Sequence, residues 1–351
     1  MSGTNSAERP ASSGRAAAGT TDTPAEPAVT GKAAARPLRK AAGAGTRTTS
    51  GGTPLRPDRL SRHNLSGWLY STPFLAFFVT FMAVPILATL VMSFTDFGLR
   101  NVTNPFDAEF VGLENYSELL GDEQFLRALF NTGYFVVLGV PLTIGCGLLA
   151  AVLLNSGIER FRTFFRVGFY APVVTAIVAV AVVWRFVLDP SEGLIAGLAA
   201  QVGLTAPDFL ASESLAMPSL IAMAVWRNLG TSMVLFLAGL QAIPTEVREA
   251  AKLDGAGAFQ EFRRITVPLL RPTMLYVTVM TTIGFLNVFE EPFVMTNGGP
   301  SDSTLTVSLL MYREGFNFFN MGYASSMAYT LFVIILAVTL LQMRLLKDKT
   351  K

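Results

Sequence analysis

Six long apolar stretches constrain the fold of this chain more than any other feature. Each holds roughly twenty residues with few charges, which is the length that an α-helix needs to cross the hydrocarbon core of a bilayer. They occupy residues 70–94, 130–154, 167–188, 217–240, 267–289 and 321–343. Because a chain in lipid must satisfy its backbone polar groups internally, these stretches predict an all-α, polytopic membrane protein with six transmembrane helices.

The composition agrees with a membrane protein and excludes several other classes. Of 351 residues, 51% are hydrophobic and only 15% are charged. The formal net charge of +2 is too small to favour a nucleic-acid partner. Cys146 is the single cysteine and His63 the single histidine, so the chain can form no internal disulfide and has no histidine cluster. We therefore expect no metal site and no catalytic site.

Residues 1–62 differ in composition from the rest of the chain. They are rich in Ala, Gly, Ser, Thr and Pro and contain almost no large apolar side chains. Such a segment buries too little surface to offset the entropy of ordering it, so it is predicted to be a disordered tail. The six spans then form one domain over residues 63–351, whose activity we expect to survive removal of residues before about Ser61.

The distribution of charge predicts the orientation of the spans. Lys and Arg are concentrated in the tail, in the loop after the second span, in the segment after the fourth span and at the C-terminus. The alternate loops are acidic, with Asp107, Glu109 and Glu114 in one and Asp189 and Glu192 in another. By the positive-inside rule, both termini and the segment 244–268 are cytoplasmic.

The segment 244–268 is too structured to be a simple connector. Thr245 is placed to N-cap a helix, and Gly255 after Asp254 is a typical C-terminal stop. A second short helix from about Gly257 would put Phe259, Phe262 and Thr266 near one face. The pattern predicts a helix–turn–helix, either an amphipathic hairpin on lipid headgroups or a docking element for a partner.

The same segment carries the strongest resemblance to a known family. The spacing of the Glu-Ala-Ala triplet, a glycine, an isoleucine and a proline resembles the EAA signature of permease subunits of ATP-binding-cassette (ABC) importers, with Val267 where leucine is usual. Further stretches resemble the branch that imports carbohydrates, of the maltose and glycerol-phosphate type. These are "FVGLENY" (110–116), "LAGLQAIP" (237–244), "MTNGGP" (295–300) and "GYASSMAY" (322–329). The resemblance extends from about Leu65 to the C-terminus.

The resemblance implies partners as well as a fold. In this family the EAA loop docks on a cytoplasmic ABC ATPase dimer, which would place a set of residues at that contact: Glu249, Ala250, Ala251, Asp254, Gly255, Ile265 and Pro268. ATP and Mg²⁺ would then belong to the ATPase, and this chain would bind no cofactor and be no enzyme. A second permease subunit, expected to be a different chain, and an extracytoplasmic solute-binding protein that meets the outer loops complete the assembly in the bacterial inner membrane.

Polar and aromatic residues within or near the spans are candidates for the substrate path, because burying polar groups in lipid is costly. They are Trp226, Arg227, Asn228, Thr231, Phe285, Asn287, Phe289 and Glu290. For Arg227 the alternative is a structural ion pair with Glu290 or Glu291.

The sequence therefore predicts a permease subunit that carries a sugar or sugar derivative across the membrane. The alternative is an ion-coupled secondary transporter of a small polar solute. The EAA loop discriminates between the two, because only the ATP-driven importer requires it.

Overall fold

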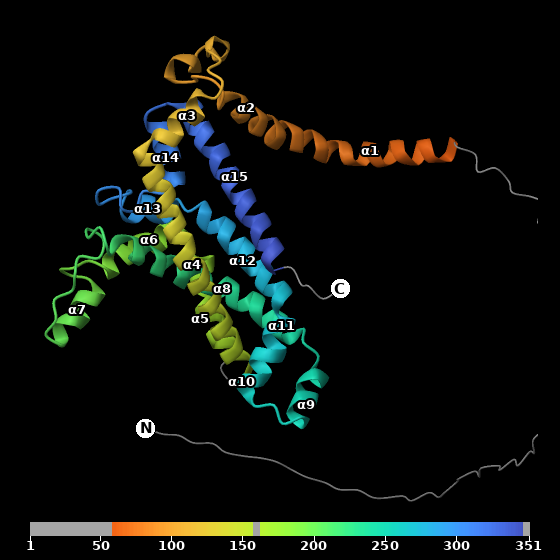
Figure 1. Cartoon of the computed structure of the whole chain (residues 1–351), viewed down its shortest axis with the longest axis vertical. Helices are drawn as coiled ribbons and strands as arrows, with labels where there is room; N and C mark the ends of the chain where they lie inside the picture. The colour runs from red at the N-terminus through yellow and green to blue at the C-terminus, as the bar shows by residue number, and fades with distance from the viewer. Residues whose placement is uncertain (1–57, 157–161, 347–351) are drawn as a thin grey trace, which may run out of the picture. The chain divides into compact units, whose positions relative to one another are not determined.

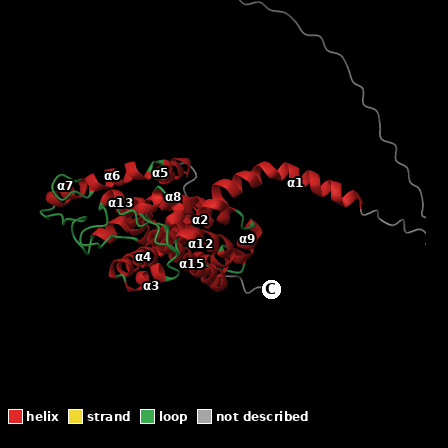
Figure 2. Ribbon diagram, turned by 90° about the horizontal axis from the view of Figure 1, so that it is seen from above, coloured by secondary structure: helices red, strands yellow, loops and turns green. Residues whose placement is uncertain are grey.

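The computed structural model describes residues 58–156 and 162–346. Residues 1–57 of the predicted tail lie outside the described residues. The first helix begins at Asp58, inside the range predicted to be disordered. Within the described residues every regular element is a helix, apart from one isolated bridge between Thr95 and Phe110 (Figure 2). The contacts between residues divide the chain into two units, Met1–Asn64 and Leu65–Lys351. The long helices pack together within the second unit.

The α-helices follow one another along the chain, with short 3-10 and π-helices between them. The α-helices are α1 (Asp58–Phe78), α2 (Val84–Met92), α3 (Glu114–Gly121), α4 (Glu123–Ser156), α5 (Arg162–Val174), α6 (Ile177–Val187), α7 (Leu194–Gln201), α8 (Ala216–Gln241), α9 (Thr245–Leu253), α10 (Ala258–Glu261), α11 (Val267–Leu269), α12 (Arg271–Leu286), α13 (Glu290–Met295), α14 (Val307–Tyr312) and α15 (Met321–Leu346). The π-helices are η1 (Val79–Ala83), η4 (Phe262–Thr266) and η5 (Arg313–Asn317), and the 3-10 helices are η2 (Leu99–Val102) and η3 (Pro105–Asp107).

Four of the six predicted spans are continuous helices in the described chain. Trp68–Met92, Glu123–Asn155, Ala216–Gln241 and Met321–Leu346 are each long and apolar enough to cross a membrane. The third and fifth predicted spans are bent pairs: Thr163–Val174 with Ile177–Val187 at 102°, and Ala258–Leu269 with Arg271–Leu286 at 67°. The number of spans is six when each bent pair counts as one.

Local backbone chemistry explains both bends, which the apolar windows alone do not reveal. Ala176, between α5 and α6, has ψ 127°, so one extended residue interrupts the helical path. The fifth span bends at Leu270, directly before the Arg271–Pro272 start of α12. Proline has no N–H to donate to the preceding turn and suits the first turn of a new helix. The third and fifth predicted spans are therefore present as bent helix pairs.

The core of this unit forms where α4 packs along α8, with α12 lying against α4 and α15 (Figure 1). Close approach of α4 and α8 depends on small residues. A Cβ added to Gly147 would lie 2.6 Å from the Cβ of Ser232. Such small-residue contacts are typical of helix pairs that associate in lipid. Fully buried Phe135, Phe236 and Met223 fill the space on either side of this contact.

The two ends of the helical unit carry different loops. α9 and α10 lie at one end, and α3, which belongs to the segment 93–122, lies at the opposite end (Figure 1). None of the most apolar window of Trp68–Met92 is buried, whereas half of that of Ala216–Gln241 is. The first span therefore presents its apolar side chains to whatever surrounds this chain.

Candidate functional site

The predicted helix–turn–helix is present and is called here the EAA hairpin (residues 245–266). Its first helix, α9, begins at Thr245, and Pro244 occupies the cap position without a side-chain hydrogen bond. The prediction that Thr245 caps the helix was therefore wrong, because Pro244 with φ −57° and ψ 136° forms the boundary instead. The second helix, α10, begins after Gly257, as the sequence predicts.

The turn of the EAA hairpin depends on Gly255. This residue has φ +78°, a left-handed conformation that costs any other residue energy. The N–H of Gly255 donates to the carbonyl of Lys252 at 3.1 Å, and the N–H of Ala256 donates to the carbonyl of Ala251 at 2.9 Å. These bonds close the end of α9 at Asp254. The predicted stop at Asp254 and Gly255 is confirmed.

The signature residues do not all face the same way. Glu249, Ala250, Asp254 and Gly255 are exposed, whereas Ala251 is only 7% exposed. Ile265 and Pro268, the remaining two, are half-buried beneath the hairpin. A partner could touch the four exposed residues, while Ala251 serves the close packing inside the hairpin.

Two apolar side chains extend the exposed face of the hairpin. Leu253 is 88% exposed and Phe259 is 74% exposed. The prediction that Phe259, Phe262 and Thr266 share a face was wrong, since Thr266 is buried. The reason is the π-helix η4, whose wider turn changes the phase of the side chains after Phe262. The periodicity of the sequence did not single out Leu253.

Four of the path candidates belong to α8, where they differ in exposure. Trp226 is 44% exposed, and its ring lies 5.7 Å from that of Trp184 on α6. Thr231 is also exposed. Asn228 is half-buried and donates Nδ2 to the carbonyl of Ala224 on its own helix at 2.9 Å. The exposed indole of Trp226 offers the flat apolar face on which a sugar ring can stack.

Arg227 lies near α13 but forms no ion pair in the described chain. Its Nε is buried without a hydrogen-bond partner, and neither Glu290 nor Glu291 comes within salt-bridge distance of it. Burial raises the pKa of the Glu291 carboxyl above its ordinary value, and the charge of Arg227 partly opposes that rise. The alternative role for Arg227, a structural ion pair with Glu290 or Glu291, is therefore not formed. Glu290 is exposed.

The path candidates at the end of α12 and just beyond it include both buried and exposed residues. Phe285 is 5% exposed, with its ring 5.1 Å from that of Phe135 on α4. The packing of this chain covers its ring, so Phe285 contributes to the core, and its role in the path stays a prediction. Asn287 is exposed and lines a cavity of about 560 Å³ together with Phe289, Tyr312 and Phe316. The sequence did not single out Tyr312 or Phe316.

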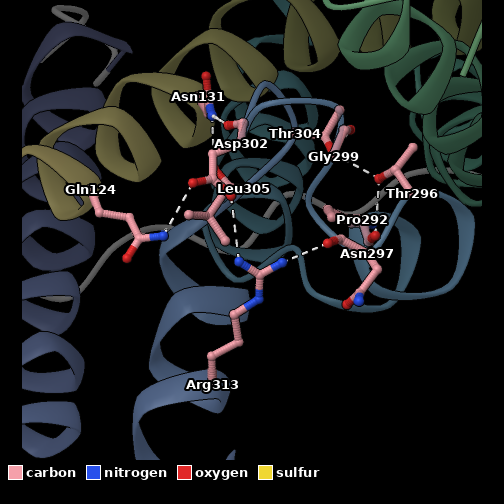
Figure 3. Close-up of polar contacts among 10 residues, drawn as sticks. All are labelled: Gln124, Asn131, Pro292, Thr296, Asn297, Gly299, Asp302, Thr304, Leu305 and Arg313. Atoms are coloured by element: carbon pink, nitrogen blue, oxygen red, sulfur yellow. Dashed lines mark hydrogen bonds and ion pairs between the residues drawn. The ribbon is translucent and has the colours of Figure 1, made fainter. Parts of the chain in front are cut away.

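The stretch that carries "TNGGP" forms a closed structure, called here the outer loop (residues 296–305) after the side of the membrane on which it is predicted to lie. The hydroxyls of Thr296 and Thr304 lie 2.7 Å apart, and Thr304 donates its hydroxyl to the carbonyl of Gly299 at 2.8 Å. Asn131 of α4 donates Nδ2 to the carbonyls of Asp302 at 2.8 Å and Leu305 at 2.9 Å (Figure 3). The outer loop is thus bound both to itself and to α4.

Comparison with known proteins establishes the family. Residues 143–350 match the family described as the binding-protein-dependent transport system inner membrane component, and the chain belongs to this family. The "probable ABC transporter permease protein YesP" of Bacillus subtilis is 36% identical over 300 residues, which cover 84% of this chain and 94% of that relative. The protein is therefore a permease subunit of a binding-protein-dependent transporter.

Another relative and a solved structure extend the comparison. The "arabinooligosaccharides transport system permease protein AraP" of Bacillus subtilis is 31% identical over 280 residues, covering 79% of this chain and 87% of the relative. The fold matches a crystal structure of a bacterial alginate ABC transporter in complex with an alginate pentasaccharide-bound periplasmic protein. That match has a TM-score of 0.73 and 24% identity, and covers 84% of this chain and 99% of the other.

Proposed function

We propose that this chain forms half of the translocation path of an ATP-driven importer for a sugar or sugar derivative, delivered by an extracytoplasmic binding protein. The observation that carries the proposal is the EAA hairpin, an exposed pair of short helices at one end of the helical unit. A second permease subunit supplies the other half of the path. The uncovered apolar surface of Trp68–Met92 supports such a neighbour.

The surface chemistry of the hairpin favours a protein partner over lipid headgroups. Leu253 and Phe259 expose apolar area beside Glu249 and Asp254, and the four acidic residues of the hairpin balance its four basic ones. The cytoplasmic leaflet carries a negative surface potential, which attracts segments with a net positive charge. An apolar surface without that net charge therefore suits the cleft of a cytoplasmic ABC ATPase, and this docking would place the hairpin and both termini in the cytoplasm.

Two observations support a sugar as the cargo: the names of similar proteins, and the exposed aromatic residues among the path candidates and their neighbours. AraP is named for arabinooligosaccharides, and the alginate transporter of similar fold carries a polysaccharide. In this chain Phe289, Tyr312 and Phe316 line one cavity with the exposed Asn287, and Trp226 exposes an aromatic face on α8. Aromatic faces with a few polar groups are the usual recognition chemistry for sugar rings.

The test is reconstitution of the complex purified through a tag on this chain. We expect an ABC ATPase to co-purify and its ATP hydrolysis in liposomes to rise when a sugar-loaded binding protein is added. The sugar that gives stimulation and uptake identifies the cargo. Purification without any ATPase, together with uptake driven by an ion gradient, would instead support the secondary transporter.

A further inference from the structure

Arg313, the first residue of η5, bridges the two limbs of the outer loop. Its Nη2 donates to the carbonyl of Asn297 at 2.6 Å, and its Nη1 lies 3.4 Å from Oδ1 of Asp302 (Figure 3). The planar guanidinium can hold two acceptors in a fixed relation, which a single ammonium cannot do equally well. Arg313 therefore fixes the distance between the two limbs.

Gly298 is the residue that admits this guanidinium. A Cβ at position 298 would lie 2.7 Å from Nη2 of Arg313, and the residue has φ +81°. The first glycine of "TNGGP" thus serves two purposes, the left-handed turn and the close approach of Arg313. Gly298 of the motif is therefore in close contact with Arg313, which belongs to none of the motifs found in the sequence.

The bridge connects the outer loop to two other parts of the chain. Asp302 also accepts a hydrogen bond from Nε2 of Gln124 on α4 at 3.1 Å. Next to Arg313 in the sequence, Tyr312 packs its ring 5.3 Å from that of Phe289, one of the path candidates. A movement of the outer loop would therefore reach α4 through Asp302 and the aromatic group through Arg313.

We propose that Arg313 is a positioning residue that holds the outer loop in the conformation that receives the binding protein, so that docking is transmitted to Tyr312 and Phe289. The inference rests on the proposed function. The loop exposes Asn297 and Ser301, and the hydroxyls of Thr296 and Thr304 and the carbonyl of Asn297 are already hydrogen-bonded, so a partner need not order these groups on binding. Pre-ordering of this kind strengthens an interface without any new contact.

The experiment compares Arg313→Gln, Arg313→Lys and Gly298→Ala in the reconstituted complex. Each variant disturbs the bridge, by removing the charge, by removing the fork or by displacing the guanidinium. We expect each to weaken the affinity for the loaded binding protein by about tenfold and to lower the stimulated ATPase rate. Amide hydrogen exchange of residues 297–302 should rise before any binding protein is added. Arg100→Gln, which removes an exposed guanidinium from the segment 93–122, is the matched control.

Separate results test the inference and the proposed function. If the wild-type complex responds to a loaded binding protein and the three variants respond equally well, the role of Arg313 is refuted while the proposed function stands. If no binding protein stimulates the wild-type complex, the proposed function fails first. Loss of the co-purifying ATPase in all three variants would also refute the inference, because Arg313 would then support only the fold.

Discussion

The Nε of Arg248 lies 2.8 Å from Oε1 of Glu261, and this ion pair joins α9 to α10 across the EAA hairpin. The side chain of Glu261 is 11% exposed and that of Arg248 is 38% exposed. A cavity of about 250 Å³ adjoins both residues, so packed side chains do not fully enclose the ion pair. The ion pair and the turn at Gly255 therefore hold the two helices together. A force on the exposed face of α9 would be passed through this pair to α10 and on to the fifth span.

Removing either member of the pair should loosen the hairpin. We expect Arg248→Gln and Glu261→Gln to destabilise the closed hairpin by about 1 kcal/mol, a modest cost because Arg248 is partly screened by solvent. Sugar uptake per ATP hydrolysed should fall while the chain still inserts. Cleavage of the hairpin by a protease and the coupling ratio in liposomes measure the two effects.

The exchanged pair Arg248→Glu with Glu261→Arg should recover most of the lost coupling. Arg264→Gln removes an exposed cation from the same hairpin and is the control, with no expected effect. Unchanged coupling in both single variants would show that the pair is a passive surface contact.

Replacing Gly255 by alanine and by glutamate should distinguish the effect of backbone strain on uptake from the effect of an added charge. No atom lies within 4 Å of a Cβ added there, so the cost comes from φ +78° alone. A residue with a Cβ pays roughly 1–2 kcal/mol in this conformation, which should reorient α9 relative to α10. We expect Gly255→Ala to lower uptake partly and Gly255→Glu to abolish it, with insertion intact in both. Gly257, which has a negative φ and an equally open surrounding, gives the control Gly257→Ala. Normal uptake by Gly255→Glu would contradict the coupling role of the turn.

The sequence predicted the apolar spans and the turn at Gly255 because both depend on local chemistry. Hydropathy reports length and composition, and a glycine after a helical segment reports a left-handed residue. The apolar windows do not locate the bends at Ala176 and Leu270, because hydropathy does not report a single extended residue or a proline at a helix start. Which aromatic side chains are buried depends on tertiary packing, which the sequence alone does not reveal. Phe285 and Trp226 are both aromatic residues within predicted spans, yet one lies in the core and the other is exposed.

Because Phe285 is buried and Trp226 is exposed, replacing each side chain by alanine should have different effects. Phe285→Ala empties a site packed against Phe135, which should cost roughly 3–5 kcal/mol and reduce the amount of assembled protein. Trp226→Ala removes an exposed ring, so assembly should persist while KM for sugar uptake rises several-fold. Comparing uptake with the amount of chain in the membrane distinguishes them. A fall in assembly for Trp226→Ala without a change in KM would move Trp226 from the path to the interface with another subunit.

The contact between α4 and α8 can be tested with two neighbouring glycines. A Cβ at Gly147 would lie 2.6 Å from the Cβ of Ser232 and 3.3 Å from the backbone N of Met233, whereas a Cβ at Gly145 would meet nothing within 4 Å. Gly147→Ala therefore forces two spans apart at a cost of about 1–3 kcal/mol, while Gly145→Ala should be neutral or slightly stabilising, because alanine favours the helix. The melting temperature of the purified complex measures both. Equal melting temperatures would show that α4 and α8 can separate freely at this point, and the small-residue contact would then contribute nothing to the bundle.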